Sequence, residues 1–309
     1  EFKRLGVMGD WANPYLTMNY AYEAVIAREC MKFGLNGGLM RSKKPIHWCF
    51  TCQTALAEAE IEYQDDATAS IFVKFLLQDD LTAEHPVLTG KTVYVVIWTT
   101  TPWTLPANLG IALHPDFEYV AVDTGAGGVF IMARDLVDAC MARFGVRDFS
   151  ILTRLDPKTL ERKRCRHPLY SRDSLIVLSR HVTLDAGTGC VHTAPGHGRE
   201  DHEVGLEYGL EVYSPVDDRG RFTPDVEFFG GQFVFDANTP ISARLRENGT
   251  LVHEGRFERG RTIHSGFEFN PGWNAAGERD RVAAAHRGHV RASGRVAHRG
   301  HRGTRNGRR

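Results

Sequence analysis

Between about residues 66 and 265 the chain consists mainly of short β-rich runs, and this pattern limits its possible folds more than any other feature. Three helical patterns interrupt the runs, at Asp135–Phe144, Arg199–Tyr208 and Thr239–Glu247. Strands and helices do not alternate regularly, so a complete Rossmann domain is not expected here. The pattern predicts an α+β domain around a barrel-like or mixed sheet. Pro, Gly and Asp separate the six predicted strands, which are Ser70–Leu77, Val93–Thr99, Tyr119–Asp123, Val129–Ala133, Leu175–Leu178 and Gly189–Thr193.

Residues 1–65 differ from this region and are predicted to form a separate connection. Asn19 can cap a helix that Gly34 can end, because apolar residues recur between them at near-helical spacing. A tight knuckle containing Cys49 and Cys52 follows, and then a short helix-like run, Ala55–Glu60. Since the first residues carry neither a starting Met nor an apolar leader, we expect the chain to begin within a longer protein.

Residues 266–309 form the third predicted region, a tail rich in Arg, Gly and His. From Ala276 onward it holds ten arginines, no lysine and two acidic residues, so a basic tail is joined to an acidic body although the formal net charge is zero. Such a composition buries too little apolar surface to offset the entropy of ordering. We expect it to be disordered or frame-shifted, and its charge offers non-specific binding to RNA as an alternative function.

The bulk composition indicates a soluble protein. Hydrophobic residues make up 42% of the chain and charged residues 25%, and no apolar run approaches the roughly 20 residues that cross a bilayer. The chain has six cysteines and no secretory signal, which favours a reduced, cytoplasmic setting. No membrane association is expected.

One segment, Trp98–Asn108, combines features suited to ligand binding. A strand rich in β-branched residues runs into four threonines, Pro102 and Pro106 stiffen the segment, and Asn108 ends it. Hydroxyl and amide groups on a rigid segment provide a neutral hydrogen-bonding surface for a ribose, a phosphate or an ester. By composition alone, an ordinary threonine-rich strand exit explains the segment better.

The amino-acid order of this segment favours a functional site over an ordinary strand exit. Thr-Thr-Thr-Pro-Trp-Thr-Leu-Pro-Ala-Asn resembles the editing segment of isoleucyl-tRNA synthetases, a class I family whose valyl and leucyl relatives usually carry Thr-Thr-Arg-Pro there. Gly187–Asp201 resembles the family's other editing signature. Gly9–Met18 and Pro45–Tyr63 resemble the passage from the family's Rossmann catalytic domain, which is missing here, into its inserted editing domain. The likeness runs from about Phe2 to Ser265.

The resemblance implies proofreading by hydrolysis of mischarged Val-tRNA(Ile). Valine and isoleucine differ by one methylene, which supports only modest discrimination, and this family is itself the standard example of a second hydrolytic site. In the family's signature a His and an Asp nine positions apart face the substrate, here His192 and Asp201. The expected catalytic residues are Thr101, His192 and Asp201, and the expected substrate-binding residues are Trp98, Thr99, Thr100, Thr104 and Asn108.

Each of these residues has an expected role. Thr99, Thr100 and Thr101 would hold the terminal adenosine and the ester, and Thr104 and Asn108 would shape the amino-acid pocket. Asp201 would bind the α-amino group, for which a carboxylate is the natural partner. His192 would orient the ester and limit side-chain size. Two alternatives stay open: an inactive fragment that only binds tRNA or aminoacyl-adenosine, and an editing domain of a valyl or leucyl relative.

The expected partners are tRNA(Ile) and mischarged Val-tRNA, with the protein as a monomer. No cofactor is expected in this chain, because ATP and Mg belong to the parent synthetase and the chain lacks a Lys-Met-Ser-Lys-Ser loop. Cys49 and Cys52 supply only half of the four ligands that structural zinc requires, and no cysteine follows Gly266. We therefore favour no bound zinc. The His-x-Gly-His matches at His286 and His298 lie in the tail, so we interpret them as accidental.

Overall fold

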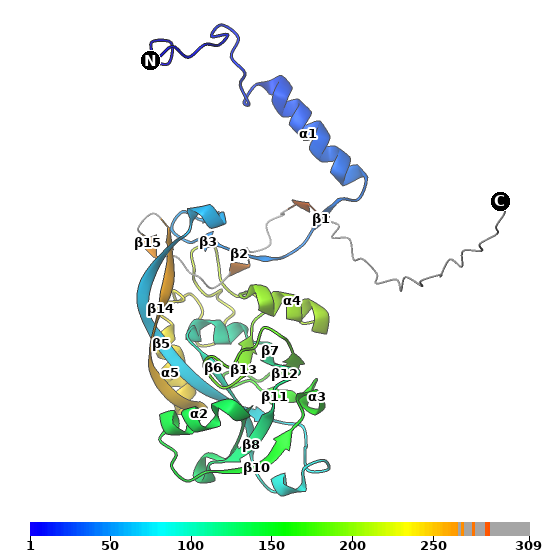
Figure 1. The fold of residues 1–309 in the computed structure, drawn as a ribbon, viewed down its shortest axis with the longest axis vertical. Coiled ribbons are helices and arrows are strands. Elements are labelled where there is room, and N and C mark those ends of the chain that lie inside the picture. The colour runs from blue at the N-terminus through cyan, green and yellow to red at the C-terminus, as the bar shows by residue number, and fades with distance from the viewer. Residues whose placement is uncertain (265–266, 269–273, 276–281, 285–309) are drawn as a thin grey trace, which may run out of the picture. The chain divides into compact units, whose positions relative to one another are not determined.

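The computed structural model describes residues 1–264, 267–268, 274–275 and 282–284 (Figure 1). They fall into two compact units, one of residues 1–42 and 280–309 and one of residues 43–279. In the smaller unit, Asn19 caps α1 (Tyr20–Leu35), because its side chain accepts a hydrogen bond from the Ala21 amide. The helix ends at Leu35 and not at Gly34. Strand β1 (Leu39–Arg41) pairs with β17 (Val282–Ala284).

The larger unit contains a closed barrel of six strands. Following the pairings from β5 leads back to β5, so the ring is complete, and the α+β fold with a mixed barrel is confirmed. Two pairs in the ring are parallel, β6 with β13 and β7 with β12, and the others are antiparallel. In order around the ring the strands are β5 (Glu62–Leu77), β6 (Val93–Thr99), β13 (Cys190–Thr193), β7 (Gly110–Leu113), β12 (Asp173–Leu178) and β11 (Arg164–Arg166).

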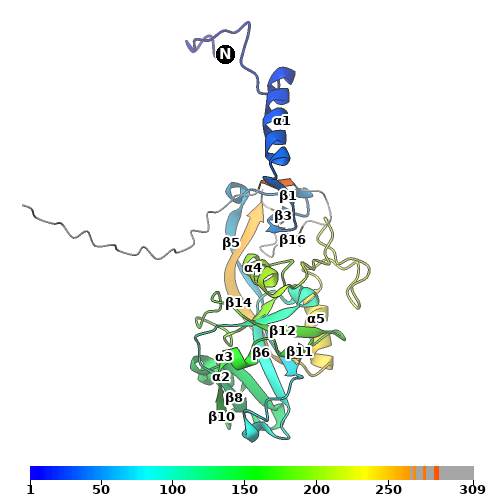
Figure 2. The same ribbon diagram turned by 90° about the vertical axis from the view of Figure 1, so that its right-hand side faces the viewer.

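Two groups of strands extend the barrel. The first half of β6 pairs with β9 (Val129–Ala133). Strand β9 pairs in turn with β8 (Tyr119–Asp123), and β8 pairs with β10 (Ser150–Leu155). Along β5 runs β14 (Leu251–His264), which pairs in turn with β15 (Phe267–Glu268). Figure 2 shows β5 and β14 as a long antiparallel pair that reaches past the other barrel strands.

Further short elements lie in this unit. The helices are α2 (Val137–Phe144), α3 (Pro157–Leu160), α4 (Arg199–Tyr208) and α5 (Asn238–Glu247). The 3-10 helices are η1 (Glu58–Glu60), η2 (Pro86–Leu88), η3 (Pro102–Ala107), η4 (Gly125–Gly127) and η5 (Arg134–Leu136). The remaining strands are β2 (Pro45–Ile46), β3 (Trp48–Cys49), β4 (Thr54–Ala55) and β16 (Asn274–Ala275).

The period of two along β5 divides its side chains between two environments. Val73 and Phe75 are completely buried in the main core, which Trp103 and Leu105 of η3 also enter. Phe72 faces the other way, into a second cluster that includes Val96 of β6 and Met141 of α2. The barrel is therefore packed on the inside, and α2 covers part of its outer face.

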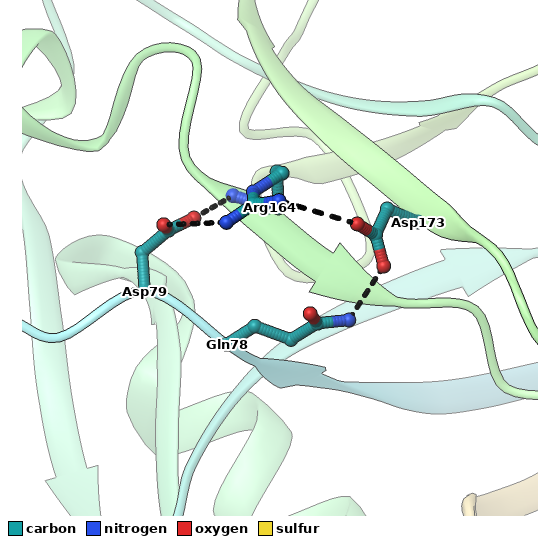
Figure 3. Close-up of polar contacts among 4 residues, drawn as sticks. All are labelled: Gln78, Asp79, Arg164 and Asp173. Carbon is teal, nitrogen blue, oxygen red and sulfur yellow. Dashed lines mark hydrogen bonds and ion pairs between the residues drawn. The ribbon is translucent and has the colours of Figure 1, made fainter.

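A set of polar side chains, which we call the polar clip, lies where β5, β11 and β12 meet (Figure 3). Arg164 lies between two carboxylates, at 3.5 Å from Asp79 and 3.8 Å from Asp173. The backbone amide of Arg164 also donates to Asp79, and the Gln78 amide donates to Asp173 at 2.6 Å. Because these groups are partly exposed, we expect the clip to add little stability.

Several sequence expectations can be compared with this structure. The bounds of β6, β8, β9 and α4 agree with those predicted. The helix expected at Ala55–Glu60 is wrong, because only η1 forms there and Thr54–Ala55 is instead the second strand of the Cys49 hairpin. Most of the predicted tail at 266–309 lies outside the described residues. Within the part that is described, no helix is both long and apolar enough to cross a membrane.

Candidate functional site

The threonine-rich segment forms a buried 3-10 helix. All six residues of η3 are buried, and Thr101 immediately precedes it with its carbonyl accepting both the Thr104 amide (3.0 Å) and the Thr104 hydroxyl (2.8 Å). Trp103 donates its amide to the Asn238 side chain of α5 at 3.0 Å. Proline at the first helical position and the buried tryptophan hold the segment rigidly at the end of β6.

The segment lines a cavity of about 560 Å³, which we call the threonine cavity. Its walls come from the end of β6, the segment after it, the loop before β13, β13 itself and the start of α4. Seven of the eight residues predicted as catalytic or substrate-binding line it: Trp98, Thr99, Thr100, Thr101, Thr104, His192 and Asp201. Asn108 does not, because it is completely buried behind His192.

A chain of hydrogen bonds fixes the His192 ring. The Ser174 hydroxyl donates to the Asn108 side-chain oxygen at 2.6 Å, and the Asn108 amide donates to the Gly110 carbonyl and to His192 Nδ1, the latter at 3.1 Å. His192 Nε2 lies 2.8 Å from the Thr104 hydroxyl, whose own proton goes to the Thr101 carbonyl. Nδ1 must therefore accept and Nε2 must carry the hydrogen.

This environment keeps His192 neutral. Burial, with a smaller contribution from nearby His197, lowers the pKa of His192 to about 4. Since both ring nitrogens are engaged, taking up a proton at Nδ1 would break the bond to Asn108. His192 is thus suited to act as a fixed polar wall and not as a general base.

Asp201 has the opposite perturbation. It lies in the first turn of α4, and its carboxylate accepts the Ala194 amide at 3.0 Å. Burial raises the pKa of Asp201 to about 7, against the smaller opposing effect of this hydrogen bond. A carboxyl group in this state gains the most when a cation enters beside it, because the cation restores the charged form.

Two glycines let the chain pass close to the cavity wall. Gly187 has φ +81°, and a Cβ there would lie 2.9 Å from the Trp98 ring. Gly189 has φ +72°, and its Cβ would lie 2.4 Å from the Ala133 Cβ. Positive φ and the lack of space both require glycine at these positions. The glycines therefore set how near this loop approaches β6 and β9.

The sequence interpretation missed other residues of the cavity. His181, Thr183, Asp185 and Thr188 also line it, and Ser174 supports it from behind through Asn108. His181 bonds Ser179 through Nδ1 at 2.7 Å, and burial lowers its pKa. These residues could have been expected from the sequence, because they lie in the loop directly before β13, whose His192 was already predicted to belong to the site.

Cys49 and Cys52 form a turn at one end of the β3–β4 hairpin. The Cys52 amide donates to the Cys49 sulfur at 3.3 Å, and this thiol neighbour raises the pKa of Cys52. Two thiols are half of a tetrahedral zinc site, and the described residues contain no group of three or more potential metal ligands. Two cysteines alone do not supply the four ligands of a structural zinc ion, and the absence of zinc stays a prediction.

Comparisons with known proteins place the chain in a family. The family described as tRNA synthetases class I (I, L, M and V) matches residues 1–275. The chain is 60% identical to isoleucine–tRNA ligase of Geobacter sulfurreducens over 84% of its own length and 28% of the relative's, and 54% identical to that of Syntrophotalea carbinolica over 82% and 27%. It thus spans little more than a quarter of these curated relatives.

Solved structures show a weaker likeness. The P. knowlesi cytosolic leucyl-tRNA synthetase editing domain gives a TM-score of 0.48 at 11% identity, covering 63% of this chain and 97% of that one. The P. falciparum counterpart gives 0.49 at 9% identity, covering 60% and 99%. Because these scores are low, the assignment rests on the sequence matches together with the motifs in the threonine cavity. The chain belongs to the class I tRNA synthetases (I, L, M and V).

Proposed function

We propose that this chain hydrolyses the ester of a misacylated tRNA in the threonine cavity, with Val-tRNA(Ile) as the substrate. The observation that carries the proposal is the placement of Asp201, whose carboxyl group lies in one cavity with the threonine hydroxyls and the neutral His192. An aminoacyl ester has a free ammonium group, a carbonyl and a ribose, which match a carboxylate, hydroxyl donors and further hydroxyls.

The hydroxyl pair of Thr99 and Thr101 provides a donor for the ester carbonyl. Their oxygens are 3.2 Å apart, and the Thr101 amide also donates to the Thr99 oxygen at 3.1 Å. Only one of the two hydroxyl protons can serve the bond between them. The other proton can therefore point toward a bound carbonyl oxygen and stabilise the negative charge that develops on it.

In the proposed reaction, a water oxygen bonds to the ester carbonyl carbon and the bond from that carbon to the ribose oxygen breaks. The ribose oxygen takes up a proton, which releases free valine and tRNA with its terminal hydroxyl. Asp201 holds the ammonium group and so places the carbonyl beside the threonines. Ester hydrolysis is favourable in water, so no ATP is required from this chain.

Discrimination against isoleucine would come from the wall formed by His192. The ring is held at both nitrogens, and Thr104 and Asn108, which hold it, are themselves buried. A wall that cannot move excludes one additional methylene more effectively than a mobile one. We propose that valine fits against this wall and isoleucine does not.

A binding module without turnover is the second candidate, and the coverage of the relatives favours considering it. The chain spans 28% of the Geobacter sulfurreducens relative, so groups that grip tRNA elsewhere in such proteins would not contribute. Binding of a non-hydrolysable valyl-adenosine ester analogue without release of valine from Val-tRNA(Ile) would select this candidate.

The monomeric state and the cytoplasmic location remain predictions.

The decisive experiment measures deacylation of Val-tRNA(Ile) and Ile-tRNA(Ile) by the purified chain and by Asp201→Ala. Asp185→Asn is the matched control, because Asp185 also lines the cavity but is exposed. We expect wild type and Asp185→Asn to release valine at similar rates, and Asp201→Ala to release it at least 100-fold more slowly. Equal rates for wild type and Asp201→Ala would refute the proposal.

A further inference from the structure

A second cavity, of about 460 Å³, lies against the outer face of the barrel, and we call it the outer pocket. Since Val73, Phe75 and Leu77 of β5 belong to the core, the alternation of side chains turns Lys74 and Leu76 outward. Both line the outer pocket. The cavity therefore lies on the opposite face of β5 from the barrel interior.

The strand register gathers the other charged and aromatic groups around Leu76. Leu76 is paired with Tyr94 on β6 and with Arg166 on β11. Residues paired across a sheet share a face, so Tyr94 and Arg166 also point outward, with Lys74 two positions along the same face. Residues His167–Ser171 and Asn248–Thr250 complete the walls.

The two cations of the outer pocket, Lys74 and Arg166, make no ion pair with any residue that the structure describes. Within the described part of the chain, no Asp or Glu lines this cavity. Nearby Lys91 differs, because its ammonium group lies 2.7 Å from Asp123. The Lys74 ammonium instead lies 4.6 Å from the centre of the Tyr94 ring, and burial lowers the pKa of Lys74.

We propose that the outer pocket binds a phosphate group, with Lys74 and Arg166 as its charged contacts. A guanidinium supplies paired donors in a plane and an ammonium supplies a point charge, and both are common partners of phosphate. Two cations that make no ion pair in the described part of the chain match the negative charge and the several oxygens of a phosphate. Tyr94 and Ser171, two residues that carry hydroxyl groups, line the same cavity.

The test is a titration of the isotope-labelled chain with inorganic phosphate, followed by backbone amide shifts in NMR spectra at low ionic strength. We expect saturable shifts at Lys74, Arg166 and Thr250. Lys74→Met and Arg166→Gln should each weaken binding about tenfold or more. Arg154→Gln, the control that removes an equal charge from an exposed ion pair outside this cavity, should change binding less than twofold.

Two results would overturn the proposal. One is the absence of saturable shifts around the outer pocket in the folded wild-type chain. The other is equal weakening by Arg154→Gln and by Arg166→Gln, which would indicate general attraction to positive charge. Arg166→Gln keeps the test decisive if Lys74→Met does not fold, because the Arg166 side chain is exposed.

A competition arm identifies the source of the phosphate. Displacement of inorganic phosphate by an RNA oligonucleotide without terminal phosphates points to a nucleic-acid backbone. Displacement by a nucleoside monophosphate alone points to a free phosphomonoester. Both results uphold phosphate recognition. Because deacylation at Asp201 is measured separately, failure of the outer pocket and failure of the proposed hydrolysis are distinguishable.

Discussion

Replacing Asp201 by Asn should stabilise the protein at neutral pH while removing its proposed activity. The pKa of this carboxyl group is raised from 3.8 to about 7, chiefly by burial. Asparagine has similar volume, keeps an oxygen that can accept the Ala194 amide, and carries no charge to desolvate. The variant therefore isolates the cost of holding an ionised carboxylate in the threonine cavity.

The size and sign of the effect follow from proton linkage. Between pH 4 and 7 the folded state binds this proton more strongly than the unfolded state, so wild-type stability falls as pH rises through this window. The difference between 3.8 and about 7 corresponds to a ceiling of about 4 kcal/mol. Asp201 keeps part of its surface open to the cavity, so we expect about 1–3 kcal/mol.

The assay is urea unfolding of wild type and Asp201→Asn at several pH values from 4 to 8. The contribution of His192 to the pH dependence must be removed. Because its pKa is lowered in the folded state, it makes stability fall as pH drops from 6.5 toward about 4, which is opposite to the effect of Asp201. Taking the difference between the two proteins at each pH removes this contribution. We expect the difference to be near zero at pH 4 and to reach its full value above pH 7. A difference that does not change with pH would refute the reasoning.

Three further predictions concern stability. Asn108→Ala leaves the Ser174 hydroxyl and His192 Nδ1 buried without a partner, and should lower the free energy of unfolding by about 2–4 kcal/mol in chemical denaturation. In Gly189→Ala the new Cβ has a positive φ of +72° and also meets the Ala133 Cβ, whereas in Gly209→Ala it has a φ of +69° with no atom within 4 Å. We expect Gly209→Ala to lower the free energy of unfolding by about 1 kcal/mol, and Gly189→Ala to lower it by at least about 2 kcal/mol more. Equal losses would contradict the crowding argument. Arg164→Ala removes exposed ion pairs only, so the free energy of unfolding should fall by less than about 1 kcal/mol in chemical denaturation. A larger loss would mean that the clip holds the barrel closed.

Elements with a strong local pattern could be read from the sequence. The β-branched run at Val93–Thr99 and the amphipathic run at Arg199–Tyr208 have the bounds expected of them, because hydrophobic period and glycine placement are local properties. Seven of the residues that line the threonine cavity were also recognisable, through the amino-acid order of Trp98–Asn108 and Gly187–Asp201, whereas His181, Thr183 and Asp185 were not. Their roles in catalysis and binding stay predictions.

Other elements exist only through pairing. Strands β7 and β11 have four and three residues, too few to show a period, and they form because closing the barrel supplies partners on both sides. The sequence likewise does not reveal that Asn108 lies behind His192 and not on the cavity wall. Tertiary packing decides this, since only the fold brings Ser174 to the Asn108 oxygen.

The order of residues along the chain supplies the chemical groups of the threonine cavity, and their surroundings in the fold set their protonation states. A histidine, an aspartate and four threonines could be named from their order in the chain. Whether the histidine is neutral, and whether the aspartate has a pKa of about 7, depends on how much water and which donors surround them. The register that places Lys74 and Arg166 in one outer pocket depends on strand pairing across about 90 residues, which no local pattern contains.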